Sequence, residues 1–247
     1  MLRKANIARA NADKKRYHLL DELRGLAVVA MVVFHALFLL SEVFGYAAAR
    51  GLLLAIWPLQ PFIAGTFILV CGICCRLSRS NLRRGLRIGG FALALTLGTV
   101  LIRLIGIDQV ILFGVLHFLA AAILLFCLAA KVLENIPPWA QLIVFAALFF
   151  VARFFLTLPA TESLALFIVG FPSAVWHSAD YFPLVPWLFL FLAGTAIGVW
   201  AKQGRFPAWF ERPRAAPLRW AGRHAIWIYL AHQPVMYAGV MAWQWLT

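Results

Sequence analysis

The stretch RYHLLDELRGLAVVAMVVFHALFLL, residues 16–40, decides the fold of this chain. It is apolar over a length that crosses a hydrocarbon core of about 30 Å as a helix, and a helix satisfies its own backbone hydrogen bonds. Yet it carries Asp21, Glu22, Arg24 and, deep among the apolar residues, His35. Ionisable groups cost several kcal/mol in lipid, so they predict that one side of this helix faces protein or water.

The composition is that of an integral membrane protein. Of the 247 residues, 64% are hydrophobic and 13% are charged, whereas a soluble domain has roughly 45–50% apolar residues. Apolar runs of spanning length recur along the chain and predict an all-α, polytopic membrane helix bundle of about seven spans. We expect a basic tail over residues 1–17 and a single transmembrane domain over residues 18–247. The spans are expected near residues 18–40, 52–75, 88–105, 110–130, 139–157, 184–201 and 224–246.

Basic residues predict the orientation. Most of the 22 Lys and Arg lie in the tail and in two segments, RLSRSNLRRGLR at 76–87 and KQGRFPAWFERPRAAPLRWAGR at 202–223. With the N-terminus in the cytoplasm, only Arg50, Arg103 and Arg153 are left toward the outer side, as the positive-inside rule requires. The segment 159–187, rich in Pro and aromatic residues, then lies outside between the fifth and sixth spans, as a partly re-entrant element or a lid.

The first apolar run is expected to stay in the chain, although YAAAR at 46–50 offers the small residues that follow a signal peptide. A signal peptide has a short basic leader and an apolar core of about 7–15 residues, unlike residues 16–40. The net charge of +13 is explained by orientation and anionic lipid, so nucleic acid is not an expected partner. Binding of a cytosolic polyanion, such as a nucleotide cofactor, by the same arginines stays an open alternative.

Four cysteines, at positions 71, 74, 75 and 127, lie near the ends of apolar runs beside basic segments. Their Cys-x-x-Cys spacing lacks the second pair or neighbouring His that would complete a metal site. We therefore expect no disulfide and no metal, and interpret the cysteines as small residues in helix packing.

One stripe of the first apolar run collects its polar residues, because steps of three and four at about 100° per residue keep to one face of a helix. The stripe consists of Asp21, Arg24, Val28, Met31, His35, Phe38 and Glu42. Arg24, near the cytoplasmic face, and His35, between the midplane and the outer third, lie roughly 16 Å apart along the axis. Arg24 is either an interface anchor or part of a site. His35 is either bonded to a neighbouring helix or catalytic.

Other histidines and one carboxylate join His35 as catalytic candidates. His117 is expected about seven residues inside its helix, roughly 10 Å deep, at a depth where it could share a site with His35. An imidazole accepts and returns a proton near neutral pH, as acyl transfer to a hydroxyl or amine requires. The outer segment WHSADYFP adds His177 and Asp180. His232 precedes a proline and is interpreted as a structural hydrogen-bonding residue at a kink.

Three residues are candidates for binding a substrate at the outer side. Arg103 and Arg153 are expected at the outer ends of their helices, where each either holds an anion or snorkels to lipid headgroups. Trp176, in the outer segment, is the third candidate.

Four stretches, in chain order, resemble a known family: LLDELRGLAVVAMVVFH at 19–35, ILFGVLHFLA at 111–120, SADYFPLVPWLFLFLAGTAIG at 178–198 and GRHAIWIYLAHQPV at 222–235. They are similar to the bacterial relatives of heparan-alpha-glucosaminide N-acetyltransferase, over about residues 16–238. This resemblance implies a location in the bacterial inner membrane. The spacing from Arg24 to His35 also resembles the membrane acyltransferases that O-acetylate cell-surface sugars.

The resemblance implies an all-helical membrane enzyme that moves an acetyl group from cytosolic acetyl-CoA to an amino or hydroxyl group of a sugar or glycan outside. His35 matches the position of the histidine regarded as catalytic. Arg24 is then the first candidate for binding the CoA phosphates, followed by Arg76, Arg83, Arg84 and Arg87. The heparan acceptor does not carry over, because the chain is shorter than the lysosomal enzyme. Covalent acetyl-histidine and direct transfer both stay open, as does a homo-oligomer.

A small transporter or channel is the competing hypothesis. Buried His, Asp and Arg could bind a proton or an anion at the middle of the membrane. It predicts solute flux without consumption of CoA, and inverted repeats, of which the chain shows none. A structural membrane protein would have no need of the buried charged stripe.

Overall fold

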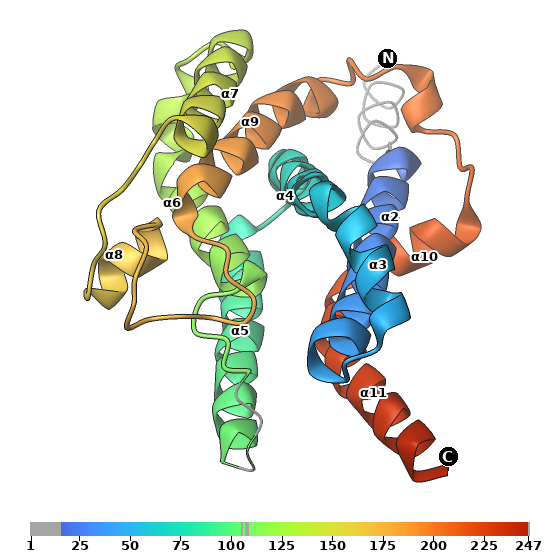
Figure 1. Ribbon diagram of the computed structural model, residues 1–247. Helices are drawn as coiled ribbons and strands as arrows, with labels where there is room; N and C mark the ends of the chain where they lie inside the picture. The colour runs from blue at the N-terminus through green and yellow to red at the C-terminus, as the bar shows by residue number, and fades with distance from the viewer. Residues whose placement is uncertain (1–15, 105, 107–108, 247) are drawn as a thin grey trace. The chain divides into compact units, whose positions relative to one another are not determined.

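The computed structural model describes residues 16–104, 106 and 109–246. Over these residues the chain is helical and has no strand (Figure 1), which confirms the predicted all-α fold. The predicted tail lies almost wholly outside the described residues. The helices are α2 (His18–Phe38), the π-helical turn η1 (Leu39–Val43), α3 (Ala47–Ile56), η2 (Trp57–Leu59), α4 (Gln60–Leu77), α5 (Asn81–Arg103), α6 (Val115–Glu134), α7 (Pro138–Phe154), α8 (Leu164–Val169), α9 (Leu184–Lys202), η3 (Ala208–Phe210), α10 (Ala216–Arg223) and α11 (Ala225–Leu246).

Five helical stretches of the described chain are long and apolar enough to cross a membrane: His18–Val43, Ala47–Leu77, α5, α6 and α9. They coincide with five of the predicted spans. At the sixth, α7 is apolar but has 17 residues, or roughly 26 Å, which is short for a core of about 30 Å. At the seventh predicted span lies α11, which is not among the five stretches of spanning length and hydropathy. The protein is thus an integral membrane protein, while its number of spans and its orientation stay predictions.

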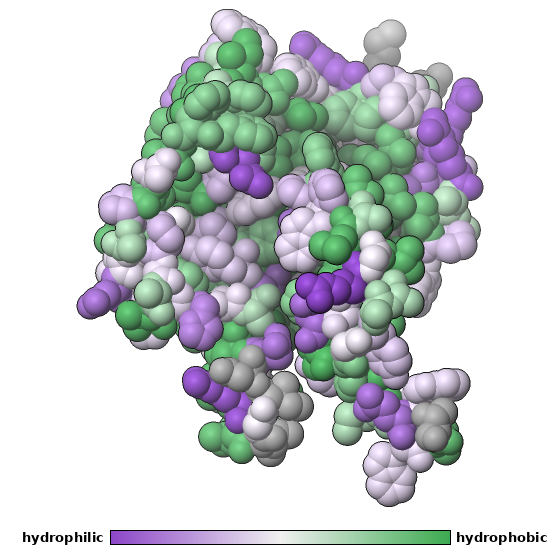
Figure 2. Space-filling view, viewed as in Figure 1, coloured by the Kyte–Doolittle hydropathy of each residue, from purple (hydrophilic) through white to green (hydrophobic). Residues whose placement is uncertain are grey.

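Large apolar side chains point outward along these helices. Leu54, Phe62, Leu93 and Leu128 are 64%, 72%, 69% and 81% exposed, and Figure 2 shows hydrophobic residues over much of the visible face. Exposed apolar surface on this scale would drive a soluble protein to aggregate, but it suits contact with lipid chains.

The contacts divide the described chain into two compact units. Unit 1 combines residues up to Phe67 with Gly204–Thr247, and unit 2 contains Ile68–Gln203. The division falls inside α4. Whether the two units form the single domain predicted for residues 18–247 stays a prediction.

In unit 1, α2 and α10 cross backbone to backbone at two glycines. A Cβ atom on Gly25 would lie 1.9 Å from the carbonyl oxygen of Leu218 and 3.0 Å from the amide nitrogen of Gly222. A Cβ atom on Gly222 would lie 1.9 Å from the carbonyl oxygen of Asp21. Any side chain at either position forces the helices apart. Glycine is required here because the two backbones approach closely, and not because the backbone adopts an unusual conformation.

The crossing places the polar stripe of α2 on its covered side. Val28 is buried with Ala221 and Ala225, and Met31 packs against this core. The opposite face of α2 carries exposed apolar residues: Leu26, Val29 and Val33. α2 therefore turns an apolar face outward, toward lipid, and its ionisable residues toward α10 and α11.

In unit 2, α4 and α9 also approach closely through glycines, slightly less so than α2 and α10. A Cβ atom on Gly72 would lie 2.2 Å from the carbonyl oxygen of Phe191, and one on Gly194 would lie 2.3 Å from that of Leu69. Phe118, Ile123 and Phe191 are fully buried in this unit, and Phe191 belongs to the contact.

The start of α6 differs from the prediction. Residues 109–114 are not helical, and α6 begins at Val115 after Gly114. His117 is therefore the third residue of its helix. The expectation that it lies about seven residues inside is wrong, because the apolar run ILFG continues the hydrophobic pattern without continuing the helix.

Candidate active site

The N-terminal end of α2 is organised by two carboxylates. Asp21 lies between three arginines: Arg16 donates to Oδ2 at 2.8 Å, Arg223 lies 3.6 Å from Oδ2, and Arg24 lies 3.6 Å from Oδ1. Arg24 also donates to the carbonyl oxygen of Gly222 at 3.4 Å. Three positive charges surround one negative charge, so this cluster retains positive potential at this end of the unit.

Glu22 holds the beginning of α10. Its side chain is buried, and Oε1 accepts hydrogen bonds from the backbone N–H groups of Arg214 and Ala215, at 2.7 and 2.9 Å, and from Arg219 at 3.3 Å. A buried carboxylate is tolerated when charge-assisted hydrogen bonds replace water. Glu22 therefore fixes the basic segment 202–223 onto α2, which sequence patterns alone do not reveal.

His35 lies against a second imidazole. The ring centres of His35, on α2, and His232, on α11, are 5.2 Å apart, with their planes at 52°. Phe34 meets His35 edge-on and packs against Trp57. His232 is 8% exposed and its Nδ1 lies 2.5 Å from the carbonyl oxygen of Tyr229. The sequence indicates a structural role for His232 at a kink, and it does not predict the neighbourhood of His232 and His35.

His117 lies in unit 2, with both ring nitrogens in hydrogen bonds. Nδ1 accepts from the backbone N–H of Gly114 at 3.3 Å, and Nε2 lies 3.0 Å from the hydroxyl of Thr96. That hydroxyl donates to the carbonyl oxygen of Ile111 at 2.7 Å. Since Nδ1 accepts, Nε2 carries the hydrogen of the neutral ring. These bonds tie α5 to the start of α6. His35 belongs to unit 1, so a site shared by the two histidines stays a prediction.

Asp180 caps the same helix start. Its Oδ2 accepts from the backbone N–H of Val115 at 3.0 Å. Ser178 accepts from the N–H groups of Leu112 and Phe113, at 3.1 and 3.3 Å. The outer segment therefore supplies acceptors for N–H groups that α6 and the preceding turn cannot satisfy themselves. A catalytic role of Asp180 stays a prediction.

Substitution of Asp180 separates the two roles. Asp180→Ala removes a helix cap and is expected to destabilise the protein by roughly 0.5–2 kcal/mol, measured as a lowered midpoint of thermal unfolding in detergent. Asp180→Asn keeps an oxygen acceptor for Val115 and is expected to restore most of this loss. If the asparagine variant is as stable as the wild type but inactive, the carboxylate takes part in the chemistry.

The remaining predicted residues of the outer segment are spread along it. His177 is exposed, whereas the indole N–H of Trp176 donates to the carbonyl oxygen of Glu162 at 2.6 Å and ties the segment to itself. Tyr181 stacks on Phe167 at 4.4 Å and donates to its carbonyl oxygen. Burial raises the pKa of the Tyr181 phenol, so this donor keeps its proton.

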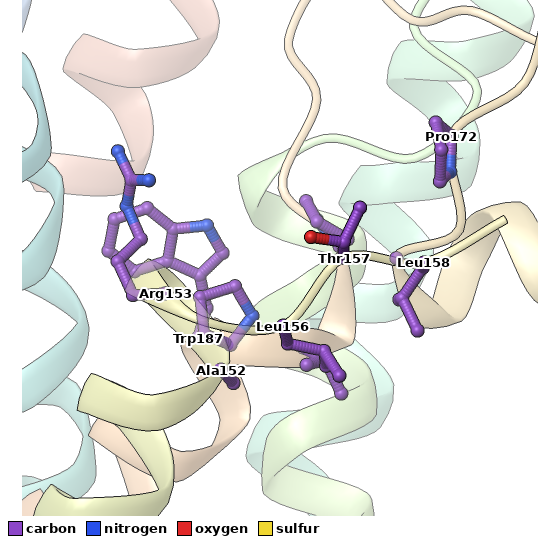
Figure 3. A pocket seen from close by; sticks show the side chains of 11 residues that line it. Ala152, Arg153, Leu156, Thr157, Leu158, Pro172 and Trp187 are labelled. Carbon is purple, nitrogen blue, oxygen red and sulfur yellow. The ribbon is translucent and has the colours of Figure 1, made fainter.

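A cavity of about 470 Å³ opens in unit 2 between the end of α7 and the start of α9. Figure 3 shows Arg153 and Trp187 on one side of it, with Leu158 and Pro172 on the other. The hydroxyl of Thr157 adds a polar group. A cation, an aromatic ring and a hydroxyl are the groups that hold a polar ring-shaped ligand. Both arginines are exposed: Arg153 lines this open cavity, and Arg103 is the last residue of α5.

The basic residues after α4 do not share one environment. Arg76 is buried: Nε donates to the carbonyl oxygen of Thr195 at 3.4 Å, Nη1 lies 3.7 Å from Glu134, and the guanidinium covers the ring of Phe126 at 4.9 Å. Arg84 lies 3.7 Å from the sulfur of Cys75. Arg83 and Arg87 are exposed. Arg76 is engaged in helix packing, and the predicted contacts of these four arginines with CoA stay predictions.

No group of three or more His, Cys, Asp or Glu residues in the described part of the chain could hold a metal ion. The four cysteines carry free thiols.

The long apolar helices, the ionisable residues on the covered face of α2 and the imidazole pair define the class of this protein. It is an integral membrane protein with ionisable side chains buried between its helices. The family described as heparan-alpha-glucosaminide N-acetyltransferase, catalytic, matches residues 16–234. The chain belongs to this family, as its motifs predicted, and is a membrane acyltransferase. Neither a curated protein nor a solved structure matches it.

Proposed function

We propose that this protein transfers an acetyl group from cytosolic acetyl-CoA to an amino or hydroxyl group of a sugar or glycan at the outer side of the bacterial inner membrane. The observation that carries the proposal is the position of His35: a half-buried imidazole within an apolar helix, on the same stripe as Arg24, in a chain of an acetyltransferase family.

The donor is proposed to bind at the N-terminal end of α2. The positive-inside rule predicts that this end lies in the cytoplasm, where acetyl-CoA is found. Arg24 and its neighbours Arg16 and Arg223 surround a single carboxylate, that of Asp21. Guanidinium groups bind phosphate oxygens through paired hydrogen bonds. His35 lies eleven residues further, roughly 16 Å along the helix, a distance that the pantetheine arm of CoA spans.

The reaction proposed at His35 moves one proton and one acyl group. The acceptor nitrogen or oxygen bonds to the thioester carbonyl carbon while His35 takes its proton, the C–S bond breaks, and the CoA thiolate receives a proton. In the covalent variant the imidazole first takes the acetyl group and releases CoA, and the acceptor then attacks the acetyl-imidazole. The cavity lined by Arg153 and Trp187 is the proposed place for a sugar near the outer side.

Reconstitution tests the whole proposal. Proteoliposomes with an amino sugar trapped inside and acetyl-CoA added outside should release free CoA thiol and acetylate the trapped sugar. Thiol release without acetylated sugar would mean hydrolysis. The competing transporter class predicts the opposite pattern: flux of a solute through the vesicles and no thiol release with any acceptor.

Arg24→Ala is expected to raise the KM for acetyl-CoA roughly tenfold or more, because a hydrogen bond to a charged group contributes about 1.5–3 kcal/mol. Asp21 keeps Arg16 and Arg223 as partners, so the fold should survive. The matched control is Arg50→Ala, which removes an exposed arginine of the same unit and should leave the KM unchanged. Equal KM values in the two variants would contradict a role of Arg24 in donor binding.

A further inference from the structure

The second imidazole beside His35 has a defined protonation pattern. A carbonyl oxygen can only accept, so the hydrogen bond between Nδ1 of His232 and the oxygen of Tyr229 requires that Nδ1 carry the hydrogen. In the neutral ring Nε2 then presents a lone pair. The bond spans three residues within α11, just before Pro234, where the proline cannot donate to the helix. It fixes the orientation of the ring.

The distance between the rings permits a direct hydrogen bond. The ring centres are 5.2 Å apart, so a nitrogen-to-nitrogen hydrogen bond comes within reach when an N–H of His35 points at Nε2 of His232. Within the described part of the chain, the structure itself holds no hydrogen bond at that nitrogen. A ring held with its lone pair available is the group that can hold an N–H of His35 and fix the direction of its other nitrogen. His232 is 8% exposed, so water does not replace it readily.

Charged groups of α2 are too distant to do the same work. Arg24 and Glu42 lie eleven residues before and seven after His35, roughly 16 and 10 Å along the axis. Asp21 and Glu22 are committed to the arginines described above and to the start of α10. In a hydrolase-like arrangement a carboxylate would orient the histidine; here another histidine stands in that place.

We propose that His232 is the positioning residue for His35 in acetyl transfer, an inference that rests on the proposed function. In the reacting arrangement His35 turns one N–H toward Nε2 of His232, which accepts it, and the other nitrogen of His35 takes the proton from the acceptor hydroxyl or amine. When His35 becomes an imidazolium, the lone pair of His232 stabilises the charge. His35 then returns its proton to the CoA thiolate, so that no net proton remains on the pair.

Two conservative substitutions separate this role from a structural one. The amide nitrogen of asparagine falls near the position of Nδ1, and the amide of glutamine reaches the position of Nε2. His232→Asn keeps the bond to Tyr229 and loses the contact with His35. It should fold normally, keep its KM for acetyl-CoA, and lose roughly 10–100-fold in kcat, as removal of an orienting partner does. His232→Gln should recover part of that kcat.

A double substitution completes the test. Because His232 acts through His35, the variant with both His35→Ala and His232→Asn should be no slower than His35→Ala alone. Full activity of His232→Asn, or losses that multiply in the double variant, would overturn the positioning role. If His232→Asn fails to fold, His232→Gln decides: kcat near that of the wild type supports the proposal, and kcat as low as that of His232→Ala contradicts it. Activity that persists in His35→Ala would instead refute the proposed function.

Discussion

Replacement of His35 by alanine is expected to lower the turnover of acetyl transfer by roughly 10²-fold or more, because it removes the group that accepts the proton or carries the acetyl group. The KM for acetyl-CoA should stay near its wild-type value, since the proposed phosphate contacts lie at the other end of the stripe. The ring is half-buried, so its removal should leave the midpoint of thermal unfolding within a few degrees of the wild-type value. Steady-state thiol release from reconstituted protein measures both constants.

The matched control for His35→Ala is His18→Gln, which removes a histidine from the first residue of the same helix. That variant should turn over at the wild-type rate. If His35→Ala also keeps near-normal turnover, or if it abolishes the folded protein, His35 is a packing residue. The family then uses another group in this chain, and His117 would be the next candidate.

Gly25→Ala is expected to destabilise unit 1 strongly. The added methyl would overlap the carbonyl oxygen of Leu218 at 1.9 Å. Because the atoms that it meets belong to the backbone, no side chain can change its rotamer to make room. Overpacking of this kind costs roughly 1–3 kcal/mol. The displaced α10 would also draw Arg223 away from Asp21 and Arg219 away from Glu22. A lowered midpoint of thermal unfolding in detergent, followed by tryptophan fluorescence, measures the loss.

Gly51→Ala is the control for Gly25→Ala, because a Cβ atom on Gly51, in α3 of the same unit, meets nothing within 4 Å. Alanine in a helix is favoured over glycine by roughly 0.5–1 kcal/mol, so this variant should be as stable as the wild type or slightly more so. Gly222→Ala should reproduce the loss seen for Gly25→Ala. Equal stability of the Gly25 and Gly51 variants would mean that α2 and α10 do not cross at these glycines.

The helical class and the covered face of α2 could be predicted from the sequence because both depend on local periodicity. An unbroken apolar run indicates a spanning helix, and the three-and-four spacing from Asp21 to His35 indicates which side is turned inward. The same reasoning missed the start of α6, since Ile111 to Gly114 are as apolar as a helix but are bonded to the outer segment through Ser178 and Asp180.

The partners of the candidate site residues could not be predicted, because they come from distant parts of the chain. The residues near Glu22 in the sequence do not indicate that it binds the N–H groups of Arg214 and Ala215. The residues near His35 do not indicate that His232 lies beside it. The sequence HQP at 232–234 marks a proline that removes one hydrogen bond from its helix, but it does not say which helix His232 packs against. Arg76 was grouped with its basic neighbours by sequence, although its burial sets it apart.

The hydrogen bonds of Glu22 can form only after most of the chain has been synthesised. Glu22 and its partner Arg214 are separated by 192 residues, which a ribosome translates in roughly 10–40 s at about 5–20 residues per second. During that interval α2 must remain in the bilayer without α10 or α11, so its carboxylates and His35 lack the neighbours that shield them in the finished protein. Unit 1 is therefore completed late in synthesis, however early its first described helix enters the membrane.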